Sequence, residues 1–487
     1  MKIVPIIGVC AVVGVAGYGF SIAANAQLAA ADATASALAN PYGRAPAASL
    51  WPGYGNPPAS LAVDPGVRGG AAGAGGPVPG ANPLLTSIFN DGLDKFNEVE
   101  DVPEGLGPRF NANSCASCHS QPAIGGSSPP NNPQLQIGVA EGARNVIPWF
   151  TTRNGPIREV RFKRHPDGSP DGNVHAIFTI TGRRDAAGCN LAQFNFGTPG
   201  NPLTGLGGNP NLAFRIPTPL FGAGLIESIP DSVILANMAA QSAQKSQIGI
   251  RGRPNSVLSG NINLGPNDGT ITRFGWKAQN KSLLLFSGEA YNVEMGITNE
   301  IFTDERDQTP GCQLNATPEN RTNYDGTTAT EVFPDIVAFS NFMRLLAAPQ
   351  PAPDTPSIVR GRANFSTIGC AACHTPTLTT AALISDISAA KPNQKVNLFS
   401  DLLVHNMGTG LADGITQGAA GPDEFRTAPL WGLGKRVFFL HDGRTRNLVE
   451  AISAHRSPGS EANQVVDNYF RASTAQQQDL LNFLRAL

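Results

Sequence analysis

The sequence has no block of basic residues and no glycine-rich loop of the kind that binds nucleotides. Its 35 lysines and arginines nearly balance its 37 aspartates and glutamates, which gives a net charge of -2 at pH 7. Proteins that bind nucleic acid usually carry a strongly basic patch, because the phosphate backbone is recognised largely through charge. The composition therefore predicts no nucleic-acid partner.

Cysteine is also scarce, and its placement is informative. Only 7 cysteines occur in 487 residues, and four of them belong to two copies of Cys-x-x-Cys-His. This pattern is typical of c-type haem attachment, in which two thiols bond to the haem vinyl groups and the adjacent histidine binds the iron. A zinc or redox cysteine pair with an incidental histidine is the alternative, but two copies favour two covalently bound haem c groups. The attachment residues are then Cys115, Cys118 and His119 in the first copy and Cys370, Cys373 and His374 in the second.

The N-terminus has the pattern of an export signal. Lys2 precedes an apolar run over residues 3–20, and the small residues 24–26 offer a cleavage site before Gln27. We expect residues 1–26 to be removed, Cys10 with them, and the mature protein to lie in the periplasm. An uncleaved membrane anchor is the alternative, since about 20 apolar residues can span a bilayer, but no stable membrane insertion is expected.

Two cysteines outside the motifs, Cys189 and Cys312, lie in surroundings rich in glycine and proline. An oxidising compartment permits a disulfide between them. Two unconnected buried thiols are the alternative.

Composition divides the rest of the chain. Residues 27–83 are dominated by alanine, glycine and proline, and offer too little apolar side chain to offset the entropy of ordering. We expect a flexible leader there. It is followed by an N-terminal haem domain over residues 84–350 and a C-terminal haem domain over residues 351–487.

The two predicted domains share a helical pattern. Gly92 and Phe96 precede the first motif, and Gly361 and Phe365 precede the second with the same spacing. Such a glycine lets a second helix cross closely while the phenylalanine packs at the crossing. Apolar residues recur at helical period over 333–346 and 474–487, which we expect to be those crossing helices. The fold class is thus mainly α, with two domains like cytochrome c.

The first domain is much the longer of the two. Roughly 210 residues separate His119 from its closing helix, far more than a short connection requires. Within this insertion, residues 157–162 and 174–181 alternate apolar and polar side chains around a turn-forming Pro-Asp-Gly at 166–168. The insertion is therefore expected to be rich in loops and partly β.

The segment around the first motif resembles a known family. Residues 109–115 (RFNANSC) and 121–126 (QPAIGG) are similar to the di-haem oxidoreductases, often called thiol oxidoreductases. That family is related to the bacterial di-haem cytochrome c peroxidases and to the methylamine dehydrogenase maturation enzyme. The resemblance extends from about Pro83 onward and implies a peroxidase-like enzyme.

The second half resembles the peroxidase segment that runs under the C-terminal haem, over residues 425–430 and 439–443. The resemblance implies a distal iron ligand fourteen positions after His441, which is His455. With His374 on the other side, that iron would be six-coordinate, closed to substrate and lower in potential than a His/Met iron. His405 and Met407 are the rival ligands, and His441 is expected to orient the haem edge.

For the first haem, the resemblance rests on residues 274–276 and 294–296. It implies that Trp276 lies between the two haem groups and that Glu294 lies over the open iron, where a carboxylate can take a proton from bound peroxide and return it to the departing oxygen. The spacing between them is two residues shorter than in the peroxidases, and Phe286 replaces a pocket glutamine. Trp276 as a core aromatic and Glu227 as the pocket acid are the alternatives.

The function that follows is a periplasmic di-haem oxidoreductase. It would take electrons at the C-terminal haem from a small cytochrome c or cupredoxin, and reduce peroxide or a related small oxidant at the N-terminal haem. A pure di-haem electron-transfer protein and a di-haem oxygenase of the rubber-cleaving kind are the alternatives. A calcium ion between the haem groups, as in the peroxidases, stays open because backbone carbonyls would hold it.

Overall fold

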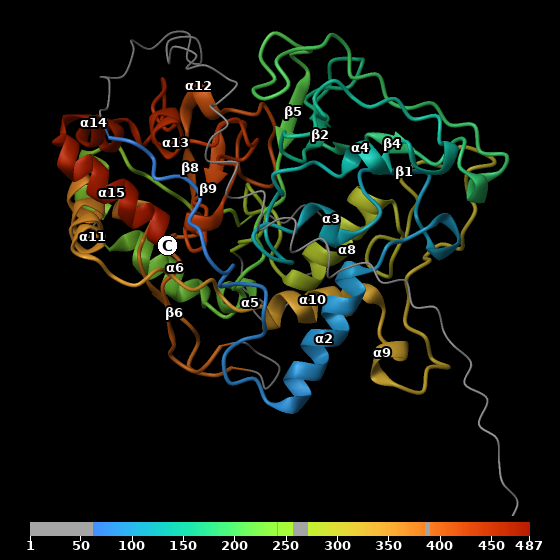
Figure 1. Ribbon diagram of the computed structural model, residues 1–487, viewed down its shortest axis with the longest axis horizontal. Helices are drawn as coiled ribbons and strands as arrows, with labels where there is room; N and C mark the ends of the chain where they lie inside the picture. The colour runs from blue at the N-terminus through green and yellow to red at the C-terminus, as the bar shows by residue number, and fades with distance from the viewer. Residues whose placement is uncertain (1–61, 241, 257–270, 385–389) are drawn as a thin grey trace, which may run out of the picture. The chain divides into compact units, whose positions relative to one another are not determined.

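The computed structural model describes residues 62–240, 242–256, 271–384 and 390–487 (Figure 1). The predicted signal, residues 1–26, and the first part of the predicted leader lie outside these ranges. Within them the chain is mainly helical with little sheet, so the predicted fold class is confirmed at this level. None of the helices described is both long and apolar enough to cross a membrane.

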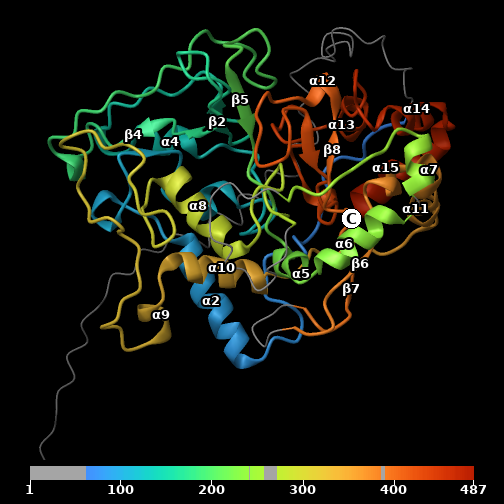
Figure 2. The ribbon, with the colours of Figure 1, turned by 180° about the vertical axis from the view of Figure 1, so that it is seen from behind.

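Two pairs of helices organise the structure. Helix α2 (Pro83–Asn97) packs on α10 (Asp335–Leu345), and α11 (Pro356–Ile368) packs on α15 (Thr474–Ala486). Figure 2 shows both pairs from behind. Both belong to one compact unit, residues 57–487, and the division into two cytochrome-like domains stays a prediction.

The repeated Gly-x-x-x-Phe pattern lies at both helix crossings, as predicted. A Cβ atom on Gly92 would lie 2.5 Å from the backbone oxygen of Ala338 in α10. A Cβ atom on Gly361 would lie 2.0 Å from the backbone oxygen of Asp479 in α15. Only glycine therefore permits these two close approaches.

The phenylalanine of each pattern packs on an aromatic ring of the partner helix. The ring centroids of Phe96 and Phe342 are 4.8 Å apart, and those of Phe365 and Phe483 are 5.5 Å apart. The two crossings thus use the same residue types in the same places.

The remaining helices are short, apart from α8, which begins after the cap residue Ser282 and ends at Gly296 in a left-handed conformation with φ of 72°. Helix α8 packs on α10 and on α5. The α-helices are α3 (Cys115–Cys118), α4 (Gln134–Ile137), α5 (Ala223–Glu227), α6 (Asp231–Ala239), α7 (Ser242–Gln247), α8 (Leu283–Met295), α9 (Ala329–Val332), α12 (Gly408–Leu411), α13 (Leu448–Ala454) and α14 (Asn463–Arg471). The 3-10 helices are η2 (Val102–Glu104), η3 (Ala140–Gly142), η4 (Arg184–Ala186), η5 (Cys370–Ala372) and η6 (Leu433–Lys435).

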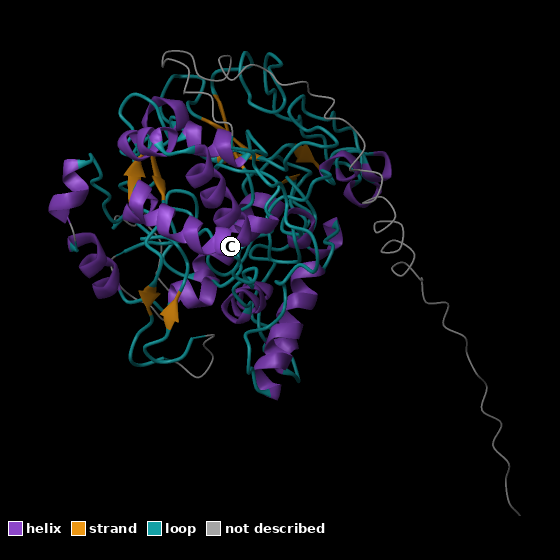
Figure 3. Ribbon diagram, turned by 60° about the vertical axis from the view of Figure 1, so that its left-hand side comes forward, coloured by secondary structure: helices purple, strands orange, loops and turns teal. Residues whose placement is uncertain are grey.

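Small antiparallel sheets lie among the helices and loops (Figure 3). Their order is β3-β2-β5 in one sheet and β1-β4, β6-β7 and β8-β9 in the others. The strands are β1 (Arg109–Phe110), β2 (Glu159–Phe162), β3 (Val174–His175), β4 (Phe178–Thr179), β5 (Leu212–Arg215), β6 (Leu378–Thr379), β7 (Lys395–Val396), β8 (Val404–Asn406) and β9 (Glu424–Arg426).

The predicted hairpin is present, but its second strand is divided. β3 pairs with β2, with Val160 opposite His175, whereas β4 pairs with β1. Between β3 and β4 the backbone N–H of Ile177 donates to the side chain of Asn111, at 2.9 Å. The N–H of Ile177 thus binds a side chain and not a neighbouring strand. The prediction of one continuous strand over 174–181 is therefore wrong.

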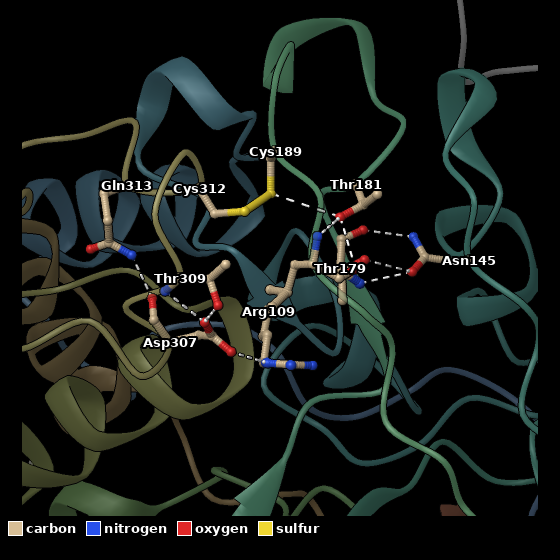
Figure 4. The surroundings of a disulfide bond; sticks show 10 residues. Arg109, Asn145, Thr179, Thr181, Cys189, Asp307, Thr309, Cys312 and Gln313 are labelled. Carbon is tan, nitrogen blue, oxygen red and sulfur yellow. Dashed lines mark hydrogen bonds and ion pairs between the residues drawn. A yellow bond between two sulfur atoms is a disulfide. The ribbon is translucent and has the colours of Figure 1, made fainter.

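Cys189 and Cys312 form a disulfide, as predicted (Figure 4). Near it, Nε of Arg109 donates to the carboxylate of Asp307 at 2.6 Å. Together these contacts tie the insertion and the segment after α8 to the strand that precedes the first motif.

The end of the predicted leader is ordered, so flexibility is wrong for residues 62–83. Asp64 forms an ion pair with Arg485 at 2.7 Å, and Nζ of Lys435 donates to the carbonyls of Gly69 and Gly70 at 2.8 Å each. The composition argument counted only apolar side chains. Here an ion pair and backbone hydrogen bonds hold the segment instead.

Candidate haem-binding sites

The first Cys-x-x-Cys-His motif borders a cavity that opens to solvent. Its empty volume, including the opening, is about 1060 Å³. Cys115, Cys118 and His119 all line it. Nδ1 of His119 lies 2.9 Å from the carbonyl oxygen of Gly126. Because a carbonyl can only accept, Nδ1 carries the proton and Nε2 keeps its lone pair. That is the arrangement of a histidine held ready to bind a metal.

The second motif repeats this arrangement in a cavity of about 1430 Å³, measured in the same way. Cys370, Cys373 and His374 line it, and Nδ1 of His374 lies 3.1 Å from the carbonyl oxygen of Phe399. Among the described residues, the thiols and ring nitrogens of neither motif converge into a three-ligand metal cluster.

His455 also lines the second cavity, at the C-terminal end of α13. Its Nδ1 lies 2.7 Å from the carbonyl oxygen of Ala451, which leaves Nε2 with its lone pair. Burial lowers the pKa of His374 to about 4, and the charge of His455 adds to this lowering. The second cavity therefore brings together two histidines that could bind one iron.

The two rival ligands differ in their surroundings. Both ring nitrogens of His405 face carboxylates, with Nδ1 2.7 Å from Glu461 and Nε2 3.0 Å from Asp401. His405 thus has no nitrogen free for a metal. Met407 borders the second cavity and packs against the apolar cluster that contains Trp276.

Trp276 borders both cavities. It is 9% exposed, and its Nε1 donates to the carbonyl oxygen of Ile216 at 2.9 Å. His441, which lines the second cavity, contacts the indole edge to face with ring centroids 6.3 Å apart. His441 also stacks on Phe425 at 4.2 Å. The indole is thus a core aromatic, and at the same time the wall that the two cavities share.

Glu294 lines the first cavity from α8. Nδ2 of Asn111 donates to its carboxyl group at 2.7 Å. Burial raises the pKa of Glu294 well above its usual range, and the neighbouring, hydrogen-bonded Glu159 raises it further. Glu294 therefore keeps its proton to higher pH than an ordinary glutamate does, in the cavity of the first motif.

Glu159 on β2 is the partner that the sequence did not reveal. Burial opposes its ionisation, but Arg161 and Arg215 lower its pKa, and Nε of Arg161 donates to its carboxylate. The two acids thus share one proton, with Glu294 as the acid and Glu159 as the carboxylate. The sequence does contain a signal for this pair: Glu159 and Arg161 are the two charged residues, of opposite sign, in the otherwise apolar strand β2.

The other predicted pocket residues are divided between the cavity and the core. Phe286 lines the first cavity, but so does Gln279, so an amide is present after all. Glu227 is absent from the residues lining that cavity. It pairs with Arg344 at 2.8 Å and accepts from the backbone N–H of Leu283 at 2.9 Å, which anchors the start of α8.

Two cavities, each with a thiol pair and a histidine whose Nδ1 faces a backbone carbonyl, separated by a shared indole, are the features of a protein with two haem groups. Residues 206–487, more than half of the chain, match the family described as "Di-haem oxidoreductase, putative peroxidase". The chain belongs to this family. The matched range contains Trp276, Glu294 and the second motif, while the first motif precedes it.

Two solved structures are similar over parts of the chain. The diheme peroxidase BthA from Burkholderia thailandensis is 16% identical, with a TM-score of 0.26, over 44% of this chain and 65% of that one. Hydrazine synthase from Kuenenia stuttgartiensis, pressurised with xenon, is 19% identical, with a TM-score of 0.21, over 33% and 56%. The match thus covers less than two thirds of either solved chain. No curated protein sequence matches this chain.

Proposed function

We propose that the protein is a periplasmic di-haem peroxidase with two covalently attached haem c groups. The observation that carries this is the difference between the two cavities. The first holds a carboxyl group with a raised pKa, Glu294, whereas the second holds a second histidine, His455, whose Nδ1 faces a backbone carbonyl. One cavity is thus suited to proton-dependent chemistry, and the other to a closed iron that only passes electrons.

The attachment residues follow from the cavity walls. Cys115 and Cys118 would form thioethers with one haem, and Cys370 and Cys373 with the other. His119, His374 and His455 would bind iron through Nε2, because a backbone carbonyl holds each Nδ1. When bound, the haem groups supply the redox chemistry, with electron entry at the C-terminal site and reduction of the oxidant at the N-terminal site.

Reduction of one hydrogen peroxide takes two electrons and two protons and yields two waters. The departing oxygen would take one proton from the carboxyl group of Glu294, and the second proton, like the one that reprotonates Glu294, would come from solvent. Arg161 lies beside the acid pair, and its charge offsets the negative charge that remains. Trp276 borders both cavities and offers an aromatic route between them.

The electrons would come from a small periplasmic donor of the cytochrome c or cupredoxin type, two reduced donors for each peroxide. The Cys189–Cys312 bridge supports an oxidising compartment and hence export. A calcium ion between the haem groups stays a prediction, since backbone carbonyls leave no side-chain signature.

The covalent haem groups can be tested by denaturation. The denatured full-length protein should retain two haems, and Cys115→Ala or Cys370→Ala should each disturb one haem and leave the other attached. Haem that extracts into acidified organic solvent would contradict the proposal.

The enzyme and the carrier can be told apart by ligand binding. For a peroxidase we expect one haem that binds cyanide or CO, together with peroxide-dependent oxidation of a reduced donor. Two low-spin haems that ignore both ligands would identify an electron carrier. Cleavage of a hydrocarbon that requires O2, without peroxide turnover, would identify an oxygenase.

A further inference from the structure

Two arginines line the second cavity on the side of Trp276. Arg426 ends β9, and Arg436 follows η6. Both border the second cavity and also a smaller one beside it, whose other walls include Trp276, Phe274 and Trp431. Arg426 is 9% exposed, and its backbone N–H donates to the carbonyl of Trp276 at 2.9 Å.

Neither guanidinium group is balanced by an acid. No ion pair links Arg426 or Arg436 to any carboxylate within the described ranges, and the bond from Nε of Arg426 to the carbonyl of Gly275, at 3.1 Å, is to a neutral group. Burial lowers the pKa of each arginine to about 10, and Arg436 contributes to the lowering at Arg426. Two like charges thus border the same two cavities.

Other buried arginines of the chain are compensated by an acid or by several carbonyls. Arg158, for example, donates to the backbone carbonyls of Asp442, Pro202 and Leu203. Arg215 lies 2.6 Å from Asp413, and Arg485 lies 2.7 Å from Asp64. Buried charges are paired in folded proteins, because removal from water is costly unless an opposite charge compensates. In contrast, the guanidinium of Arg426 has one carbonyl partner, and that of the half-buried Arg436 has no hydrogen-bond or ion-pair partner among the described residues, so both can receive an anion from the cavity.

The cavity wall does not contain that anion. Its one carboxylate, Glu461, is engaged by Nδ1 of His405 and by the backbone N–H groups of Arg251 and Asn406. The cofactor inferred for this cavity, in contrast, carries two carboxylate groups. Arginine binds carboxylates in a bidentate fork and stays charged when buried.

We propose that Arg426 and Arg436 bind the carboxylates of the haem in the second cavity, so that its acidic edge lies on the side of Trp276. This rests on the proposed function, which places a haem there. The first cavity differs, because its arginines, Arg161 and Arg215, already face Glu159 and Asp413. The two cavities thus hold their cofactors by different charge arrangements.

Redox potential reports this contact directly. A positive charge beside a haem disfavours the oxidised iron, which carries one more positive charge than the reduced iron. Loss of one arginine should therefore lower the potential of the C-terminal haem. The carboxylate left without its partner should also bind a proton more readily, which makes the potential depend on pH near neutrality.

The test is a spectroelectrochemical titration of each haem in the full-length holoprotein, at several pH values. Arg426→Gln and Arg436→Gln should each lower the potential of the C-terminal haem and add a pH dependence. Arg436→Lys keeps the positive charge, so the potential of its C-terminal haem should stay closer to the wild-type value. Arg183→Gln is the matched control: this arginine is also buried, is paired with Asp185 at 2.8 Å and does not line the second cavity, so its loss should reduce stability and leave the potential unchanged.

An unchanged potential and pH profile in both glutamine variants would overturn the inference. If Arg436→Gln fails to retain the second haem, retention in Arg436→Lys supports a role for the charge, and loss in both variants contradicts it. A wild-type protein without a second haem would instead contradict the proposed function. The two failures are thus distinguishable.

Discussion

Replacement of Glu294 by glutamine should remove proton transfer and leave the local structure intact. The glutamine oxygen can still accept from Nδ2 of Asn111, which now donates to Glu294 at 2.7 Å. Its amide N–H can still donate to Glu159, which is hydrogen-bonded to Glu294. Because both bonds have a replacement, we expect the free energy of unfolding to change by less than about 1 kcal/mol.

Turnover should change far more. Glutamine cannot give up a proton, and loss of a positioned proton-transfer group typically costs 10²- to 10⁴-fold in rate. This corresponds to about 3–5 kcal/mol of activation free energy. The optical spectra of both haems should stay nearly the same, since Glu294 is not proposed as an iron ligand.

The pH profile gives a second readout. Glu294 must be protonated to act as the acid, so the wild-type rate should fall as pH rises through its raised pKa. This alkaline decline should disappear in Glu294→Gln. In Glu159→Gln the neighbouring charge that raises the pKa of Glu294 is lost while Arg161 remains, so the decline should move to lower pH.

The assay is peroxide-dependent oxidation of a reduced small cytochrome, followed at 25 °C. Glu305→Gln is the matched control, because burial and then Asp307 raise the pKa of Glu305 to about 7, yet Glu305 does not line the first cavity. It should leave turnover unchanged. If Glu294→Gln turns over as fast as Glu305→Gln, the reasoning about the acid pair is refuted.

Three further substitutions test the rest of the site. His455→Ala should convert one low-spin haem to high-spin in the optical spectrum, and an unaltered spectrum would indicate that Met407, not His455, is the distal ligand. Gly361→Ala places a methyl group 2.0 Å from a backbone oxygen of α15, so thermal unfolding should show a loss of about 1–3 kcal/mol; equal stability would contradict the close crossing. Trp276→Phe should slow electron passage between the haems in rapid-mixing experiments while both spectra persist, and an equal rate would mean that electrons bypass the indole.

Features encoded by neighbouring residues could be predicted from the sequence. Both Cys-x-x-Cys-His motifs, the glycines at the helix crossings and the closing helices α10 and α15 depend on spacings of a few residues. Helical and turn geometry converts such spacings into structure whatever the rest of the chain does. Membership in a di-haem family followed from the same short segments.

Charge compensation was decided by the tertiary structure. The sequence showed Glu294 but not its partner Glu159, which lies far away in the chain on a strand of the insertion. It offered His405 as a rival ligand, but could not show that Asp401 and Glu461 take both ring nitrogens. Whether a charged side chain is paired, protonated or left facing a cavity depends on residues that only folding brings together.

Two predictions, the flexible leader and the continuous strand, failed because they did not consider hydrogen bonds of the backbone. Composition alone predicted flexibility up to residue 83, and alternation alone predicted one strand over 174–181. In the structure, carbonyls of Gly69 and Gly70 accept from Lys435, and Asn111 takes the N–H of Ile177. The pattern of side chains in the sequence determines which segments can be buried and which can face solvent. The hydrogen-bond partners of backbone N–H and C=O groups depend instead on which distant segments the fold brings together.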